Sequence, residues 1–154
     1  MRSDVPLRGD PTGAVGRLAE HNCFGCTPGN PKGLGLALEE GETEVTASVC
    51  LGADYESFPG VIHGGIVATI LDEIMGRAVL CAHHRLSVTA GIRIRFADVM
   101  RTGTTYVARA AVASDVDSIV KVHARVEQSQ TGLVAAAEGT FVLLTHQRLM
   151  GKVR

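Results

Sequence analysis

The stretch from Gly64 to Ala82 reads GGIVATILDEIMGRAVLCA, and its apolar residues recur at intervals of three and four. Ile66, Ile70 and Ile74 form one row, and a second apolar row lies beside it. This spacing predicts an amphipathic helix of about five turns with a broad apolar face. Because so apolar a helix has to be covered by other elements, we expect it to lie at the centre of a domain.

Strand-like sequence flanks this helix on both sides. Before it, alternating apolar and polar residues predict strands over 34–39 and 45–51, and residues 52–62 are expected to form a loop. After it come β-rich runs separated by turn-forming residues, at 88–96, 104–116, 118–128 and 133–144. One helix among strands joined by short turns predicts an α+β fold, with an antiparallel sheet wrapped around one long central helix.

Length and composition indicate one domain of ordinary globular type. The chain has 154 residues, of which 1–16 predict a flexible N-terminal tail, 17–147 a single domain and 148–154 a C-terminal tail. A formal net charge of −1 without a run of Lys or Arg argues against a nucleic-acid partner. Neither a bilayer-spanning segment nor a signal-peptide pattern is visible, so we expect a cytoplasmic protein with no membrane partner.

The start of the helix carries a pattern suited to binding a carbonyl oxygen. His63 precedes Gly64 and Gly65, and the first turn of a helix leaves backbone N–H groups without partners. Glycine lets a substrate approach the backbone closely. Such an N–H group could stabilise an oxyanion formed from a thioester. His63 itself has two open interpretations, as a reacting group or as a helix cap.

Asp72 is the second chemical feature of the helix. A carboxylate in the middle of an apolar helix is costly to bury unless it is partnered or functional. The small residues Ala68 and Gly76 lie one turn away on either side and leave room for another group. Glu73 is expected to be a solvated or paired surface residue, with Arg77 four positions later at a spacing suited to an ion pair.

The pattern His63-Gly64-Gly65-x-x-Ala68-x-x-x-Asp72 resembles the signature of the hotdog-fold thioesterase superfamily, in particular the PaaI-like acyl-CoA thioesterases. The segment Asn22-Cys23-Phe24-Gly25-Cys26 and the Asn-Pro-x-Gly-Leu-x-Leu run at 30–36 are similar to the lead-in of a subset of that family. The resemblance extends over about residues 21–145. It implies hydrolysis of a small or medium acyl-CoA or aryl-CoA to the free acid and CoA, without cofactor or metal. It also implies a homodimer with joined sheets, or a homotetramer, with active sites at the dimer interface.

The resemblance also implies catalytic roles. Asp72 is the expected general base or nucleophile, and the N–H group of Gly64 polarises the thioester carbonyl, with His63 beside it. Thr89, on the strand after the helix, would assist the water. Ser57, six residues before His63, stands where many relatives have an asparagine, and serine departs from that pattern because it has a shorter reach and no amide.

Three further residues are expected to contact substrate. Gly65 follows Gly64 in the motif. Arg93 and Arg95 alternate along one strand and face the same side, where they could bind CoA phosphates across an interface. An equally open interpretation places both arginines on a solvated sheet face.

Other functions fit the same motif. A hotdog enoyl or hydroxyacyl dehydratase would use His63 with Asp72, and a non-catalytic acyl-CoA-binding protein would use the pocket alone. Cys23-x-x-Cys26 with nearby His21 is also a weak zinc pattern. Because no second Cys-x-x-Cys follows, loop packing is the preferred interpretation of this pair.

Overall fold

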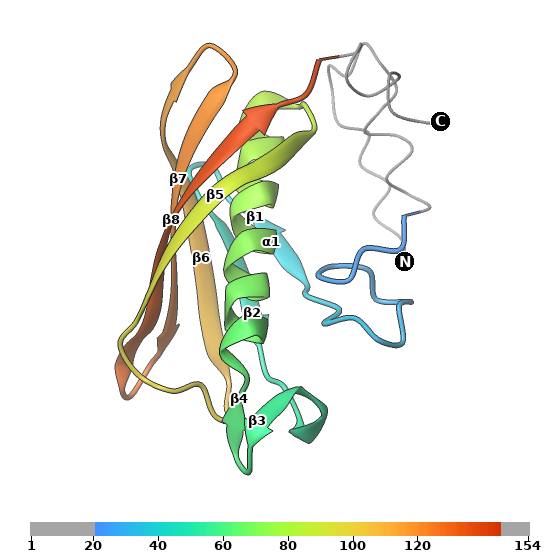
Figure 1. Cartoon of the computed structure of the whole chain (residues 1–154), viewed down its shortest axis with the longest axis vertical. Coiled ribbons are helices and arrows are strands. Elements are labelled where there is room, and N and C mark those ends of the chain that lie inside the picture. The colour runs from blue at the N-terminus through green and yellow to red at the C-terminus, as the bar shows by residue number, and fades with distance from the viewer. Residues whose placement is uncertain (1–20, 146–154) are drawn as a thin grey trace.

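The computed structural model describes residues 21–145, and it shows one long helix against a curved antiparallel sheet (Figure 1). The helix α1 spans Gly64–His83. Its sheet has the strand order β1-β2-β6-β7-β8-β5, and β3 pairs with β4 in a separate hairpin. The strands are β1 Leu38–Glu40, β2 Val45–Val49, β3 Glu56–Phe58, β4 Val61–Ile62, β5 Ser87–Phe96, β6 Tyr106–Val116, β7 Ile119–Gln128 and β8 Gly132–Leu143.

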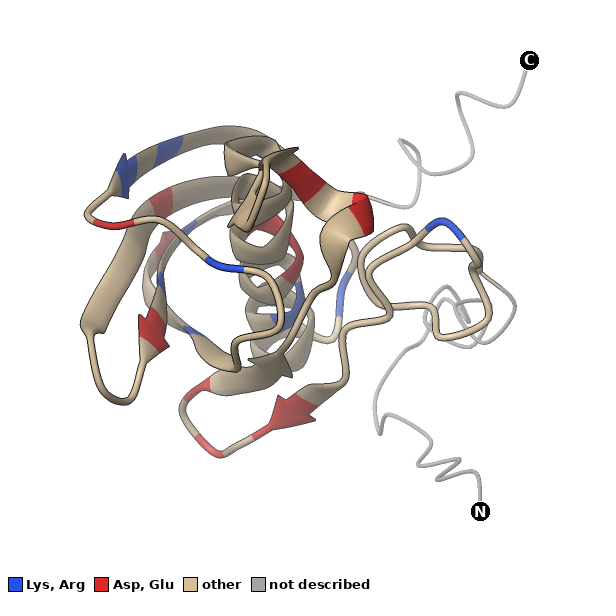
Figure 2. Cartoon of the chain, turned by 90° about the horizontal axis from the view of Figure 1, so that it is seen from below, with Lys and Arg blue, Asp and Glu red and all other residues tan. Residues whose placement is uncertain are grey.

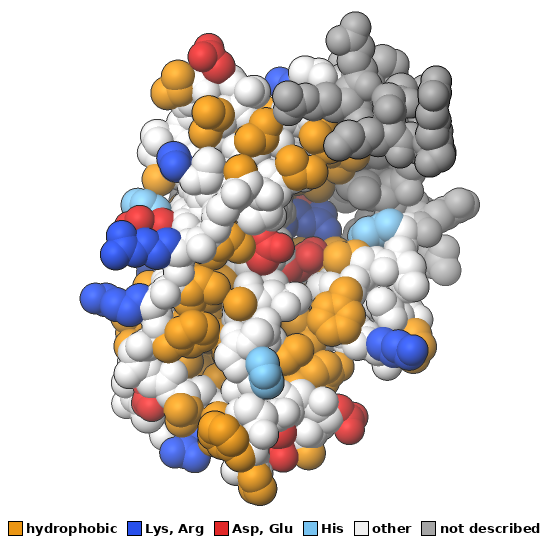
Figure 3. Space-filling model, in the orientation of Figure 1, with side chains coloured by type: hydrophobic (Ala, Val, Ile, Leu, Met, Phe, Trp, Pro, Cys, Tyr) orange, Lys and Arg blue, Asp and Glu red, His pale blue; other side chains and the backbone are white. Residues whose placement is uncertain are grey.

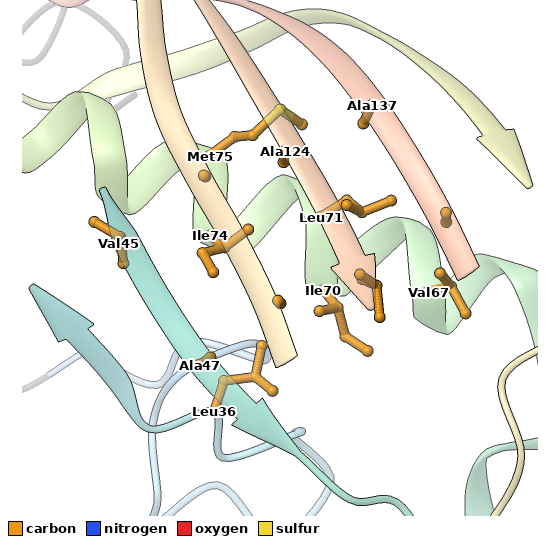
Figure 4. Packing of buried hydrophobic residues seen from close by; sticks show 14 of the residues in the cluster. Leu36, Val45, Ala47, Val67, Ile70, Leu71, Ile74, Met75, Ala124 and Ala137 are labelled. Atoms are coloured by element: carbon orange, nitrogen blue, oxygen red, sulfur yellow. The ribbon is translucent and has the colours of Figure 1, made fainter. Parts of the chain in front are cut away.

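The core lies between α1 and the inner face of the sheet. Val67, Ile70, Leu71, Ile74 and Met75 of α1 are buried and point toward the strands (Figure 4). On β7 every second residue is buried, as expected for a strand with one face on a core. Burying each such side chain contributes about 1.5–3 kcal/mol relative to leaving it exposed. The predicted α+β hotdog architecture is therefore confirmed.

Small residues on the inner face let the helix approach the sheet. Ala108, Ala110, Ala124 and Ala137 are all buried there. At Gly139 an added Cβ would lie 2.8 Å from the Met75 sulfur. The scarcity of large aromatic residues in the sequence thus corresponds to a thin layer between helix and sheet.

The first predicted strand, 34–39, is wrong in extent, because β1 begins only at Leu38. Gly35 has φ +57°, which breaks the extended conformation. The N–H groups of Leu34 and Leu36 donate instead to the carbonyls of Phe24 and Gly25. Leu36 is nevertheless buried in the core. Its apolar side chain therefore indicated a buried position correctly, although the residue is not part of a strand.

The predicted loop at 52–62 is more regular than expected. A 3-10 helix, η2, spans Ala53–Tyr55 and is followed by the β3–β4 hairpin, in which Gly60 has φ +78°. The N–H of His63 donates to the Tyr55 carbonyl, which ties the segment to the start of α1.

The predicted terminal tails and the expected absence of a membrane-spanning segment stand differently against the structure. The predicted tails, 1–16 and 148–154, lie outside the described residues. Within residues 21–145, no helix is both long enough and apolar enough to cross a bilayer.

Candidate active site

The side chain of His63 caps the start of α1. Its Nδ1 accepts a hydrogen bond of 2.9 Å from the Gly65 N–H, so the ring proton lies on Nε2. The His63 carbonyl accepts from the N–H groups of Ile66 and Val67. The Gly64 N–H finds no acceptor among the described residues, and Gly64 is exposed. The cap therefore leaves one N–H at the helix start for a ligand.

Gly65 has a steric role in this arrangement. A Cβ at this position would lie only 3.0 Å from His63 Nδ1, so a larger residue would push the ring away. At Gly64 the nearest atom to an added Cβ is in the Phe96 ring, 3.9 Å away, which is ordinary contact. The structure thus assigns Gly65 to the cap, while its predicted contact with substrate stays a prediction.

Asp72 lies on α1, partly buried, beside the start of β5. Its Oδ1 accepts a 2.7 Å hydrogen bond from the Thr89 hydroxyl. Among the described residues no Lys, Arg or His forms a salt bridge with Asp72. The carboxylate is thus oriented by a neutral donor, and within residues 21–145 its other oxygen accepts no hydrogen bond.

A β-bulge makes the contact between Thr89 and Asp72 possible. Thr89 pairs with the buried Phe141, and Gly91 pairs with Thr140 on the other face, so Ala90 is an extra residue. Without the bulge, strict alternation would place Thr89 on the same face as Arg93 and away from α1. The sequence pattern alone put Thr89 on that outer face, and only the resemblance pointed to it as a site residue.

Gly64 and Asp72 lie well apart along the helix. Eight residues at about 1.5 Å each separate their Cα atoms by roughly 12 Å. They also lie near opposite ends of β5, since Asp72 contacts Thr89 and Gly64 lies beside Phe96. The Gly64 N–H and the Asp72 carboxylate of one chain are therefore too far apart to contact the same thioester group.

Arg93 and Arg95 lie on the face of the sheet that points away from α1. Their neighbours Ile92 and Ile94 pack against the core, so the arginines alternate outward. They border a broad hollow of about 1130 Å³ with Arg109 and other charged residues. Basic positions on the strands that curve around the helix are visible in Figure 2. This hollow is an open, charged sheet surface, and neither Asp72 nor Gly64 lines it, so we do not assign the active site to it.

Ser57 lies on β3, close in the chain to the helix start. It is exposed, and its hydroxyl donates to the Val61 carbonyl at 3.4 Å across the hairpin. This bond holds the hairpin and leaves the predicted substrate contact of Ser57 a prediction.

Glu73 does not form the ion pair with Arg77 that the helical spacing allows. Arg77 pairs with Glu40 of β1 at 3.3 Å. Glu73 instead accepts a 3.3 Å hydrogen bond from the Cys23 thiol, because the loop before β1 packs against this part of α1. The helical spacing gave no signal for this contact, which joins residues 50 positions apart.

The cysteines are free, and two of them have strongly shifted pKa values. Burial and the neighbouring Glu73 carboxylate raise the pKa of the Cys26 thiol well above its usual range. Burial, with Glu40 nearby, raises the pKa of the Cys81 thiol to about 12. In the metal-free protein neither thiol is ionised at neutral pH, so neither is a nucleophile there.

A smaller hollow, of about 240 Å³, connects these features. Its lining includes Asp72, Thr89, Cys23, Glu73 and Arg77. Figure 3 shows acidic side chains gathered near the middle of this face, bordered by hydrophobic ones. The hollow is open, which leaves room for a ligand or for another chain beside Asp72.

Comparison with known proteins agrees with this architecture. The family model described as "Thioesterase superfamily" matches residues 59–135, which is half of the chain and includes α1 and Thr89. The chain belongs to the thioesterase superfamily. The family resemblance inferred from the helix motif is thereby confirmed.

Several solved structures have the same fold as this chain. The conserved protein PA5202 of Pseudomonas aeruginosa is 29% identical, with a TM-score of 0.66 over 72% of this chain and 90% of its own. The thioesterase HI1161 of Haemophilus influenzae is 20% identical, with a TM-score of 0.65 over 73% and 80%. The protein smu.793 of Streptococcus mutans, solved bound to acetyl CoA, is 20% identical, with a TM-score of 0.66 over 71% and 88%. No curated protein sequence matches the chain.

Proposed function

We propose that this member of the thioesterase superfamily hydrolyses acyl-CoA thioesters, at sites built from two copies of the chain. The observation that carries the proposal is the Asp72 carboxylate, held by Thr89 in an open hollow. Arg77 also lines this hollow, but it forms its salt bridge with Glu40, and no salt bridge to Asp72 is formed among residues 21–145. The acetyl CoA in the similar S. mutans structure supports a CoA ester as the substrate class. The acyl or aryl group is proposed to be small or medium in size.

The distance between Gly64 and Asp72 favours a site shared between protomers. An oxyanion donor has to lie about 3 Å from the carbonyl oxygen, and an attacking carboxylate about 3 Å from the carbonyl carbon. These contacts require roughly 6 Å between the two groups, whereas the helix separates their Cα atoms by roughly 12 Å. We therefore assign Asp72 of one protomer and the Gly64 N–H of its partner to one site.

The edge of β5 offers a way to assemble such a site. In the described chain β5 pairs only with β8, so one edge of this ten-residue strand is open to another strand. Val88 and Phe96 on β5 are 48% and 52% exposed, which adds apolar area to that edge. A two-fold axis would pair two β5 strands antiparallel and bring the Phe96 end of one chain to the Thr89 end of the other. Gly64 of the partner would then approach Asp72.

In the proposed mechanism the Gly64 N–H of the partner binds the thioester oxygen at the positive end of its helix dipole. Asp72 either takes a proton from a water that attacks the carbonyl carbon or attacks that carbon directly. The tetrahedral intermediate collapses and the C–S bond breaks. When water attacks, this step gives the free acid, and the proton held by Asp72 passes to the departing CoA thiolate. When Asp72 attacks, the step leaves a mixed anhydride on Asp72 and the CoA thiolate takes a proton from water, and a second water then hydrolyses the anhydride to the free acid and restores the carboxylate. Thr89 donates its proton to Asp72, so only its lone pairs are free to orient the water. His63 positions Gly64 through the cap.

The remaining predicted site residues have secondary roles in this proposal. Arg93 and Arg95 would meet CoA phosphates only if a second dimer packed against the outer face of the sheet, since they point away from α1. Ser57 lies near the helix start, where the acyl thioester would enter. For the dehydratase alternative, the cap occupies Nδ1 of His63 and leaves Nε2 as the one ring nitrogen that could take part in proton transfer.

The experiment is release of free thiol from a panel of acyl-CoA and aryl-CoA thioesters. The panel compares the wild type with Asp72→Asn, which keeps the shape and removes the negative charge. A matched control is Asp117→Asn, in the β6–β7 turn at φ +56°, where asparagine is tolerated. We expect Asp72→Asn to be at least about 100-fold slower and the control to be unchanged. Absence of thiol release by the wild type from every substrate would overturn the proposed activity.

A further inference from the structure

The loop before β1 gathers metal-binding side chains that the thioesterase chemistry does not use. His21 Nε2, Cys23 Sγ and Cys26 Sγ all lie within 4.8 Å of one another. Nε2 of His21 is 3.6 Å from Sγ of Cys26. In a tetrahedral zinc site, bonds of about 2.3 Å to sulfur and 2.0 Å to nitrogen place neighbouring ligand atoms about 3.5–3.8 Å apart. The cluster therefore needs only small side-chain movements to surround one ion.

Helix α1 offers a fourth donor at the edge of this group, Glu73, whose carboxylate is not within 4.8 Å of all three other ligand atoms. The Oε2 atom of Glu73 is 3.3 Å from the Cys23 sulfur, on the side of the cluster that faces the helix. The loop comes so close there that a Cβ at Gly25 would clash with the Glu73 carboxylate. Two sulfurs, one imidazole and one carboxylate make a four-ligand set of the kind that binds zinc.

Hydrogen bonds between backbone and side-chain groups already hold the loop in the required turn. The Gly25 N–H donates to the Cys23 sulfur at 3.2 Å, a contact that stabilises a thiolate ligand. The Cys23 N–H donates to Oγ1 of Thr27 at 2.9 Å, and the Thr27 hydroxyl donates to the His21 carbonyl at 3.1 Å. These bonds bring His21, Cys23 and Cys26 to one side of the turn without help from an ion.

Binding of a cation would change the charge of this cluster. As metal ligands, Cys23, Cys26 and Glu73 would each carry a negative charge, and a divalent cation at their centre would offset the repulsion among them.

We propose that His21, Cys23, Cys26 and Glu73 bind one Zn²⁺ ion, which ties the loop before β1 to α1. The four residues complete the coordination of the ion, so the site is structural. Glu73 adjoins Asp72 in the helix, and both border the same hollow. The ion would therefore hold the wall of that hollow in place beside the predicted catalytic carboxylate. The proposal does not depend on hydrolysis of any thioester.

The test is the zinc content of the full-length, untagged protein purified from zinc-supplemented cells, measured by inductively coupled plasma mass spectrometry. We expect about one zinc per chain in the wild type and less than about 0.1 in Cys23→Ser and Cys26→Ser. Cys50→Ser is the matched control, since Cys50 is exposed and outside the cluster, and it should keep the wild-type zinc content. A wild type without zinc, or equal zinc in Cys23→Ser and the control, would overturn the proposal.

A second measurement needs no variant and so does not depend on how the serine variants fold. Free thiols of the native wild type are labelled with a thiol reagent before and after removal of metal by a chelator. We expect removal of the metal to speed labelling of Cys23 and Cys26 at least tenfold, as located by peptide mass spectrometry. Cobalt(II) restored to the protein should give a thiolate charge-transfer absorption. Unchanged labelling rates, or a Cys23–Cys26 disulfide in place of the metal, would overturn the proposal.

Discussion

Replacement of Gly64 by proline removes one N–H group from the start of α1 and changes little else. Gly64 is the first residue of the helix, a position where proline is favoured because its N–H has no partner within the helix. His63 has φ −59° and ψ 133°, a conformation compatible with a following proline. A Cβ at this position meets only the edge of the Phe96 ring, at 3.9 Å.

The expected magnitude follows from the role given to this N–H group. Loss of one oxyanion donor lowers kcat by about 100- to 1000-fold, or about 3–4 kcal/mol of barrier. Gly64→Ala is the control, because it adds a Cβ of similar bulk and keeps the N–H. The assay is steady-state thiol release with the best acyl-CoA of the panel, with thermal unfolding measured in parallel.

The two variants together decide the role of the N–H group. We expect Gly64→Ala to stay within a fewfold of the wild type while Gly64→Pro loses activity without a lower melting temperature. Equal activities of the two variants would refute the reasoning, whether both stay active or both lose activity, because only proline removes the donor.

Two further predictions concern Asp72 and the core. Thr89→Val keeps the side-chain shape and removes the 2.7 Å hydrogen bond to Asp72, so we expect kcat to fall about tenfold or more in the thiol-release assay. A Thr89→Ser variant, which keeps the hydroxyl, should retain most activity, and parity between valine and serine would contradict the assigned role. Ile74→Ala opens a cavity at a fully buried position between α1 and the sheet, with an expected loss of about 2–5 kcal/mol of unfolding free energy. Urea denaturation checks this value, and a midpoint equal to that of the wild type would contradict the packing described.

Periodicity was enough to predict the central helix and most of the sheet. The apolar rows of α1 have one arrangement that buries them, and β7 alternates so regularly that its inner face could be read directly. The first strand failed because Leu34 and Leu36 alternate as in a strand while Gly35 adopts a positive φ. Alternation reports which side chains are buried, and it does not report where the backbone hydrogen bonds go.

The site could be predicted only in part, because its geometry depends on contacts between distant segments. A residue inserted by a bulge reverses the face of every residue beyond it, and no local signal at Ala90 marks the bulge that turns Thr89 inward. Glu73 has a favourable partner at helical spacing in Arg77, yet the structure gives each of them a different partner. The His63 cap was one of two open interpretations, and the structure decides that this contact is made.

The most direct test of the central claim is the activity of mixed dimers. Asp72→Asn and Gly64→Pro chains carrying different affinity tags are co-expressed, and the heterodimer is isolated by two successive affinity steps. If each site joins Asp72 of one chain with Gly64 of the other, one of the two sites in the heterodimer has both groups intact. The account predicts about half the wild-type thiol-release activity from two nearly inactive parents. Heterodimer activity no higher than the mean of the parent homodimers would contradict a site shared between protomers.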